Sequence, residues 1–206
     1  LIDSTFKSFF EKDIPNLDNI DFSKFSNIDI IACGSAMHAG LVGKYFLENY
    51  ANIKTTVNIA SEYRYNNKFF SNDTLVIVIS QSGETADSLA ALRAAKQHGL
   101  FVISIVNVPH SSIAREADMC IYTNAGPEVA VATTKGYTTQ VAMLTILASK
   151  IACSKGDLRL YNLLKDSYKD FKNTLEEILK DNNSYVNIAN KILNCPYLFF
   201  IGRGID

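Results

Sequence analysis

Residues 75–85 read Leu75-Val76-Ile77-Val78-Ile79-Ser80-Gln81-Ser82-Gly83-Glu84-Thr85, an apolar run that ends abruptly in hydroxyls, an amide and a glycine. Residues 85–98 then show the spacing of a helix. A strand, a polar turn and a helix in this order bring backbone N–H groups and the positive end of the helix dipole to one point, where an anion can bind. The turn contains no lysine, so it suits a phosphate monoester on a small, exchangeable ligand better than a tightly held nucleotide.

The alternation of strand and helix continues on both sides of this turn. We expect strands at 28–33, 55–59, 74–79, 101–106 and 119–122, and helices at 37–50, 85–98, 112–117 and 135–153. Short connections between alternating strands and helices indicate a parallel sheet that is covered on both faces. The sequence therefore predicts an α/β protein with three layers, α/β/α, around a mainly parallel sheet, followed by carboxyl-terminal helices.

Composition divides the chain into four segments. Residues 1–27 form an amino-terminal helix and a polar connector, and residues 28–153 form the α/β unit. Residues 154–194 are an amphipathic helical segment, and residues 195–206 are a strand that runs into a glycine-bearing turn. Because that ending resembles the start of another strand–helix unit, and because the chain begins at Leu1, we expect a fragment of a longer protein.

Three polar segments follow predicted strands and should form one rim. They are Cys33-Gly34-Ser35, residues 80–85 and residues 123–134, and parallel sheets bind ligands outside the carboxyl ends of their strands. In the second segment Ser82 or Thr85 could instead cap the following helix. Three hydroxyls and an amide exceed what one cap requires, so phosphate binding is the favoured interpretation there.

Two other segments leave their role open. Thr133 or Thr134 could cap the helix that follows the third rim segment, or line a pocket, and the sequence favours neither. Glu62 and Arg64 lie just beyond the second strand, where an exposed ion pair is the default expectation.

Several classes of function are disfavoured by composition. A formal net charge of -1 over 206 residues argues against a nucleic-acid partner, and no apolar run approaches the roughly 20 residues of a membrane-spanning helix. The chain has no dinucleotide or GxxxxGK[ST] glycine spacing, and its three histidines follow no metal-binding spacing. We therefore expect no cofactor, metal, nucleic-acid partner or membrane partner, and a cytoplasmic location for a chain with four widely spaced cysteines.

Several of these segments together resemble the first sugar-isomerase (SIS) subdomain of the glutamine–fructose-6-phosphate aminotransferase family, also called glucosamine-6-phosphate synthases. The matching segments are Ala32-Cys33-Gly34-Ser35-Ala36, Ala60-Ser61-Glu62-Tyr63-Arg64-Tyr65, Ser80 to Asp87, Asn107-Val108-Pro109, and Thr123-Asn124-Ala125-Gly126 through Thr139-Gln140. The resemblance covers nearly all of residues 28–153. It implies a flavodoxin-like sandwich, and it makes Phe200-Ile201-Gly202-Arg203-Gly204 the opening of a second subdomain.

The resemblance also implies roles for individual residues. It assigns the phosphate of fructose 6-phosphate or glucosamine 6-phosphate to Ser80, Gln81, Ser82 and Thr85, the approach to the sugar to Gly34 and Ser35, and the pocket wall to Val131 and Thr133. Some relatives carry a second hydroxyl where this chain has Ala36. One hydrogen bond to the sugar or the phosphate is therefore expected to be missing.

The family's reaction moves ammonia from glutamine onto fructose 6-phosphate and isomerises the product to an aldose. Its amine, carboxylate and imidazole come from the second subdomain, the carboxyl-terminal tail and a neighbouring subunit, so the resemblance implies no catalytic residue in this chain and no turnover by it alone. It implies a glutaminase domain and a second SIS subdomain as partners, and a homodimer. The alternatives are a stand-alone SIS module that senses sugar phosphates and a small phosphosugar isomerase.

Overall fold

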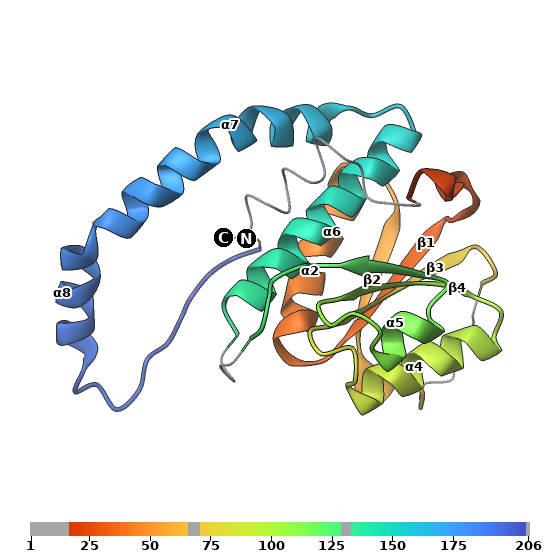
Figure 1. Cartoon of the computed structure of the whole chain (residues 1–206), viewed down its shortest axis with the longest axis horizontal. Coiled ribbons are helices and arrows are strands. Elements are labelled where there is room, and N and C mark those ends of the chain that lie inside the picture. Colours follow the sequence, from red (N-terminus) through yellow and green to blue (C-terminus); the bar gives the residue numbers. More distant parts are fainter. Residues whose placement is uncertain (1–16, 66–70, 129–132, 205–206) are drawn as a thin grey trace. The chain divides into compact units, whose positions relative to one another are not determined.

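The computed structural model describes residues 17–65, 71–128 and 133–204 (Figure 1). The chain forms two compact units, Leu1–Asn162 and Leu163–Asp206. The expected amino-terminal helix, and Val131 among the expected pocket residues, lie outside the described residues.

The first unit is built on a five-stranded sheet with the order β2-β1-β3-β4-β5, in which every pairing is parallel. The strands are β1 (Asn27–Ala32), β2 (Lys54–Ile59), β3 (Thr74–Ser80), β4 (Phe101–Val106) and β5 (Met119–Tyr122). All seven residues of β3 are buried, which explains its continuous apolar run, since a central parallel strand is covered on both faces. The five predicted strands are confirmed, and their order is that of flavodoxin-like proteins.

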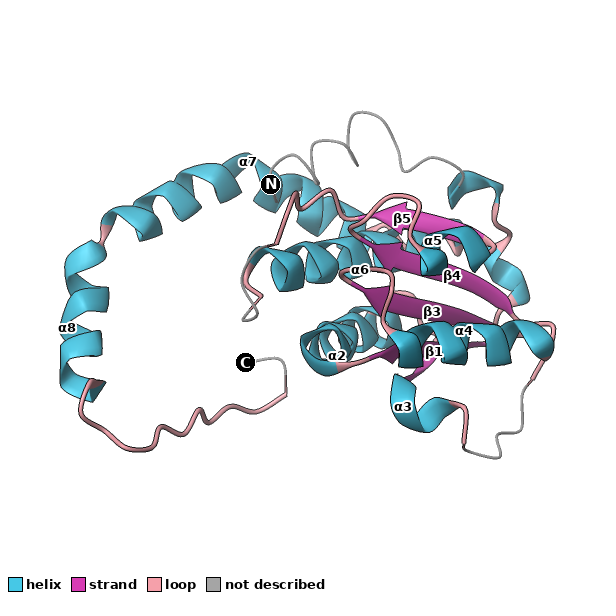
Figure 2. Cartoon of the chain, turned by 60° about the horizontal axis from the view of Figure 1, so that its bottom comes forward, coloured by secondary structure: helices cyan, strands magenta, loops and turns pink. Residues whose placement is uncertain are grey.

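Helices cover both faces of the sheet (Figures 1 and 2). They are α2 (Gly34–Asn49), α3 (Ala60–Tyr63), α4 (Ala86–Gln97), α5 (Ser112–Glu116) and α6 (Lys135–Ser154), preceded by the short 3₁₀ turns η1 (Leu17–Asn19) and η2 (Phe22–Lys24). Side chains alternate between the faces of a strand: Ile30 contacts Gly40 of α2, whereas Ile31 belongs to the core cluster that contains residues of α3, α4 and α5.

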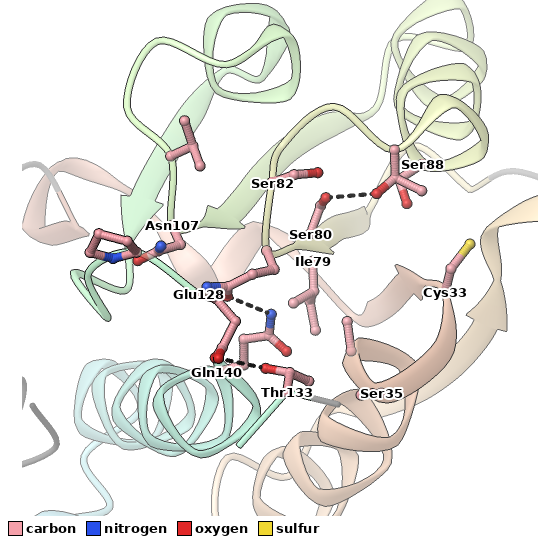
Figure 3. Close-up of a pocket in the computed structure, with 15 residues that line it drawn as sticks. Cys33, Ser35, Ile79, Ser80, Ser82, Ser88, Asn107, Glu128, Thr133 and Gln140 are labelled. Atoms are coloured by element: carbon pink, nitrogen blue, oxygen red, sulfur yellow. Dashed lines mark hydrogen bonds between the residues drawn. The ribbon is translucent and has the colours of Figure 1, made fainter. Parts of the chain in front are cut away.

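Helix α6 packs against α2 rather than directly over the central strands (Figure 1). The close approach depends on Gly43, because a Cβ atom there would lie 3.0 Å from Leu144 Cβ. This pairing holds the first turn of α6 at the same end of the sheet as the carboxyl ends of β1 and β3, as Figure 3 shows.

Helix α7 (Arg159–Lys180) runs from the first unit into the second, which also contains α8 (Asn182–Ile192). The strand expected near Phe200 is not formed, and residues 195–204 have no regular secondary structure. A strand satisfies its backbone groups only by pairing with another, which the sequence pattern alone cannot supply. Among the described residues, no helix has the length and apolar character needed to cross a membrane.

Candidate functional site

A pocket of about 530 Å³ opens at the carboxyl ends of the central strands (Figure 3). The chain leaves β1 toward α2 on one face of the sheet and leaves β3 toward α4 on the other, so the neighbouring strand ends diverge. Such a switch point is where open α/β sheets bind ligands. The lining residues are Cys33, Ser35, Ala36, Ile79, Ser80, Gln81, Ser82, Thr85, Ser88, Asn107, Val108, Pro127, Glu128, Thr133 and Gln140.

The turn between β3 and α4, residues 80–85, is held by its own hydroxyls. Ser80 Oγ accepts a hydrogen bond from the Gly83 N–H at 3.0 Å and lies 3.0 Å from Thr85 Oγ1. Gly83 has a φ of +66°, and a Cβ atom there would overlap the Ser111 side chain. Only glycine meets both conditions without strain, so the backbone shape of the turn is fixed by residue 83.

Glu84 anchors this turn to helix α5, which begins at Ser112. Its Oε1 accepts a hydrogen bond from the Ser112 N–H at 2.7 Å, and the Ile113 N–H donates to Gly83 O at 3.0 Å. The bond from Ser112 lowers the pKa of the Glu84 carboxyl. Glu84 is not among the residues that line the pocket, so its carboxylate supports the turn and does not face a ligand.

The amino terminus of α4 is left open by its neighbours. Thr85 occupies the cap position but makes no capping hydrogen bond, because its hydroxyl pairs with Ser80. Ser82 Oγ accepts from the Glu84 N–H, which precedes the helix, at 3.2 Å. The interpretation of Thr85 or Ser82 as the α4 cap is therefore wrong, and the first-turn N–H groups remain available to an anion.

The amino terminus of α6 is closed by a residue that the sequence did not suggest. Glu128 Oε2 accepts hydrogen bonds from Thr133 Oγ1 and from the Gly136 N–H, each at 3.1 Å. Thr134 is at the cap position and makes no capping bond through its side chain. The capping interpretation of Thr133 or Thr134 is therefore wrong, and Thr133 lines the pocket instead.

An amide pair joins the two walls of the pocket. Gln140 Nε2 lies 3.5 Å from Gln81 Oε1. Gly136 makes room for this contact, since a Cβ atom there would lie 2.9 Å from Gln81 Oε1. Gln81 Nε2 is buried and has no hydrogen-bond partner among the described residues, so it is available to a polar ligand.

The pocket brings together most of the predicted site residues. Ser35, Ser80, Gln81, Ser82, Thr85 and Thr133 line it. Gly34 begins α2 with a φ of +55° and lies next to the lining residues rather than among them. Val131 falls outside the described residues. Cys33 and Ala36 of the first rim segment also line the pocket.

Four polar lining residues were not proposed as ligands from the sequence. They are Ser88, Asn107, Glu128 and Gln140. Asn107 directly follows β4, and this strand-end position could have identified it. Ser88 lies one helical turn after Thr85, and its buried hydroxyl has no partner among the described residues. Glu128 lies in the third predicted rim segment, residues 123–134, although no local pattern singled it out, and Gln140 faces the pocket because of the tertiary packing of α6.

Charge is sparse in this pocket. Of the described residues that line it, Glu128 is the one that carries a charged side chain of the Asp, Glu, Lys and Arg type, and none is histidine. The same described parts of the chain contain no group of three or more His, Cys, Asp or Glu residues that could hold a metal ion. A bound phosphate would therefore be held by neutral hydroxyl, amide and backbone N–H donors.

Comparisons with known proteins identify the family of this chain and similar proteins. Residues 21–150 match the SIS domain family. The chain is 50% identical over 202 residues to a protein of Clostridium tetani named glutamine–fructose-6-phosphate aminotransferase (isomerizing), covering 95% of this chain and 33% of the relative. It therefore spans about a third of the length of the curated relatives it matches.

A solved structure extends the likeness to three dimensions. The C-terminal domain of glucosamine-fructose-6-phosphate aminotransferase from Francisella tularensis superposes with a TM-score of 0.90 at 34% identity. That alignment covers 99% of this chain and 59% of the solved one.

Proposed function

This chain belongs to the SIS domain family, and from that premise we propose that its pocket binds the phosphate group of a six-carbon sugar phosphate, fructose 6-phosphate or glucosamine 6-phosphate. The observation that carries the proposal is the open amino terminus of α4, with the hydroxyls of Ser80, Ser82 and Thr85 gathered beside it. Backbone N–H groups and hydroxyls at such a terminus are suited to a phosphate dianion.

The proposed site extends from this turn across the pocket. Ser80, Gln81, Ser82 and Thr85 would hold the phosphate, Gly34 and Ser35 would approach the sugar, and Thr133 with Val131 would complete the wall. The absence of a cation among the described lining residues suits a substrate that must leave after each turnover. Ala36 supplies no hydroxyl, so the α2 side would make one contact fewer than in relatives with a second hydroxyl.

We further propose that this chain is the phosphate-binding half of the isomerase part of a glutamine–fructose-6-phosphate aminotransferase. The names of the relatives support this. Transfer of an amino group and isomerisation need an amine, a proton-transferring carboxylate and an imidazole, which other parts of such an enzyme would supply. In this proposal residues 28–153 are the first SIS subdomain, 154–194 link it to a second one that 195–206 begin, and the whole enzyme is a cytoplasmic homodimer with a glutaminase domain.

The test is a calorimetric titration of the 206-residue chain with fructose 6-phosphate, with fructose and inorganic phosphate as controls. We expect saturable binding that requires the phosphate group and weakens about tenfold or more in Ser82→Ala, because a hydrogen bond to a charged group is worth about 1.5–3 kcal/mol. Ser154→Ala is the matched control, since Ser154 ends α6 away from the pocket lining. Equal affinity of the two variants, or no binding by a folded chain, would refute the assignment of the phosphate to residues 80–85.

A further inference from the structure

The pocket is electrostatically one-sided. Its α4 side presents neutral hydroxyls at an uncapped helix amino terminus, whereas its α6 side presents the carboxylate of Glu128. Figure 3 shows the two sets apart, with Ser80 and Ser82 on the α4 side and Thr133 and Gln140 beside the first turn of α6. Among the described lining residues, no basic side chain offsets the Glu128 charge.

The Glu128 carboxylate is fixed in position. Its Oε2 accepts from both Thr133 Oγ1 and the Gly136 N–H at 3.1 Å, and bonds from an amide and a hydroxyl resist rotation of the side chain away from the pocket. Of the first-turn donors of α6, the Gly136 N–H is taken by this carboxylate, and the carboxylate charge opposes a second anion near the same helix end. A ligand that enters the pocket therefore meets one end that favours negative charge and one end that opposes it.

The α6 side still offers hydrogen bonds to an uncharged group. The second carboxylate oxygen of Glu128 carries none of the hydrogen bonds that hold Oε2, so it can accept one from a ligand. A sugar hydroxyl can donate to this oxygen, and an ammonium group gains from the carboxylate. A second phosphate or a carboxylate has no proton to donate to it and is repelled by Glu128.

We propose that Glu128 is a specificity-determining residue, which selects sugar monophosphates whose other end is neutral or cationic and rejects sugar bisphosphates and phosphorylated sugar acids. This inference rests on the proposed function, because it takes the phosphate to lie at residues 80–85. Like charges separated by about 6–8 Å at the edge of a protein interact strongly enough to change affinity by roughly five- to tenfold.

The experiment measures dissociation constants of the full chain for three probes: fructose 6-phosphate, fructose 1,6-bisphosphate and glucosamine 6-phosphate. We expect the bisphosphate to bind about tenfold more weakly than fructose 6-phosphate, and glucosamine 6-phosphate to bind several-fold more tightly. In Glu128→Gln the amide oxygen still accepts from Thr133 and Gly136 while the charge is gone. Both differences should then shrink to about twofold or less.

Two further variants separate charge from shape. Glu62→Gln removes a carboxylate outside the pocket lining and should leave both ratios unchanged. Glu128→Ala removes the charge together with the two hydrogen bonds, so it should weaken all three ligands and still lose the discrimination. Far-ultraviolet circular dichroism establishes that each variant is folded.

The outcomes are distinct. Equal binding of the two fructose phosphates by the unmodified chain would overturn the proposal, as would discrimination that persists in folded Glu128→Gln and Glu128→Ala. Failure of the unmodified chain to bind any probe would refute the proposed function itself, and this inference with it. Binding of fructose 6-phosphate that depends on Ser82 but shows unchanged discrimination in both variants would overturn the role of Glu128 alone.

Discussion

Helices α4 and α6 both begin at the pocket after a polar loop rich in hydroxyls, yet their amino termini have opposite electrostatic character. At α4, Thr85 turns its hydroxyl to Ser80 and leaves the helix end open. At α6, the Glu128 carboxylate accepts from the Gly136 N–H of the first turn and from the Thr133 hydroxyl just before the helix. The difference teaches that a helix amino terminus attracts an external anion only where the chain has not already supplied one of its own.

The two loops also differ in the contacts that hold their shape. The α4 turn is tied to α5 through Glu84 and Gly83, at 2.7 and 3.0 Å from their partners. Its shape therefore depends on the backbone, on glycine and on an anchoring carboxylate. The α6 loop instead depends on the Glu128 side chain, which bonds both to Thr133 within the loop and to the Gly136 N–H of the helix.

Substitution of Gly83 should have the largest effect on this contrast. Gly83→Ala places a Cβ atom within 2.5 Å of Ser111 Cβ at a residue with φ of +66°. The left-handed backbone costs an alanine about 1–2 kcal/mol and forced overpacking about 1–3 kcal/mol. We expect the free energy of unfolding, measured with urea, to fall by about 2–4 kcal/mol, and fructose 6-phosphate binding to be lost.

Gly99→Ala is the matched control. Gly99 also has a positive φ, +74°, but a Cβ atom there meets no atom within 4 Å. Gly99→Ala should lose about 1–2 kcal/mol through the left-handed backbone conformation alone and keep its ligand affinity. If the two variants were equally stable, the contact between Gly83 and Ser111 would not constrain the turn.

The anchoring role of Glu84 predicts a smaller effect, on affinity. Glu84→Ala removes the acceptor of the Ser112 N–H, and a loosened turn should bind fructose 6-phosphate about three- to tenfold more weakly. Glu84→Gln keeps an acceptor oxygen and should recover most of that loss. Equal affinity of Glu84→Ala and the unmodified chain would show that the turn holds its shape without α5.

The Glu84 carboxylate should also leave a signature in the pH dependence of stability. Its pKa is lowered in the folded chain from the usual 4.5, mainly by the Ser112 N–H, so its contribution is present at neutral pH and is lost as the pH falls through the lowered value. Urea unfolding from pH 7 to pH 3 should therefore show a difference between Glu84→Ala and the unmodified chain that shrinks below pH 4.5.

The local sequence pattern was enough to predict the strands of the sheet. It was not enough to predict which residues cap the amino termini of α4 and α6. The apolar run of β3 and its neighbours specify parallel strands because burial on both faces demands continuous hydrophobic residues. Whether Thr85 caps α4 depends on Ser80, five residues away, and the α6 cap comes from Glu128 rather than from the adjacent threonines. In both cases the capping residue is decided by competition between hydrogen bonds, and the sequence does not show which of these bonds is the more stable.

Distance along the chain also limited what could be predicted about the pocket. Gln140 meets Gln81 across 59 residues only because α6 packs on α2, and no periodicity in either segment encodes that contact. The strand expected near Phe200 had the right residue types, but pairing, not propensity, makes a strand. In both cases the missing information is which segments become neighbours.

The smallest expected effect on ligand affinity concerns Asp87, the acidic residue in the first turn of α4. Asp87 lies in the first turn of α4, but its carboxylate is 3.9 Å from Arg64 Nη2, in an exposed pair. Exposed ion pairs contribute little, so Arg64→Ala should change the affinity for fructose 6-phosphate less than about twofold, measured by calorimetry at low and high salt.

Asp87→Asn provides the complementary measurement. If Asp87 is held away from the α4 terminus, removing its charge should raise phosphate affinity by less than about twofold, and the increase should vanish at high salt, where exposed charges are screened. A tenfold gain would mean that Asp87 competes for the α4 donors as Glu128 does for those of α6. The two helix ends would then differ in degree only, and the open terminus would no longer set the phosphate end of the pocket apart.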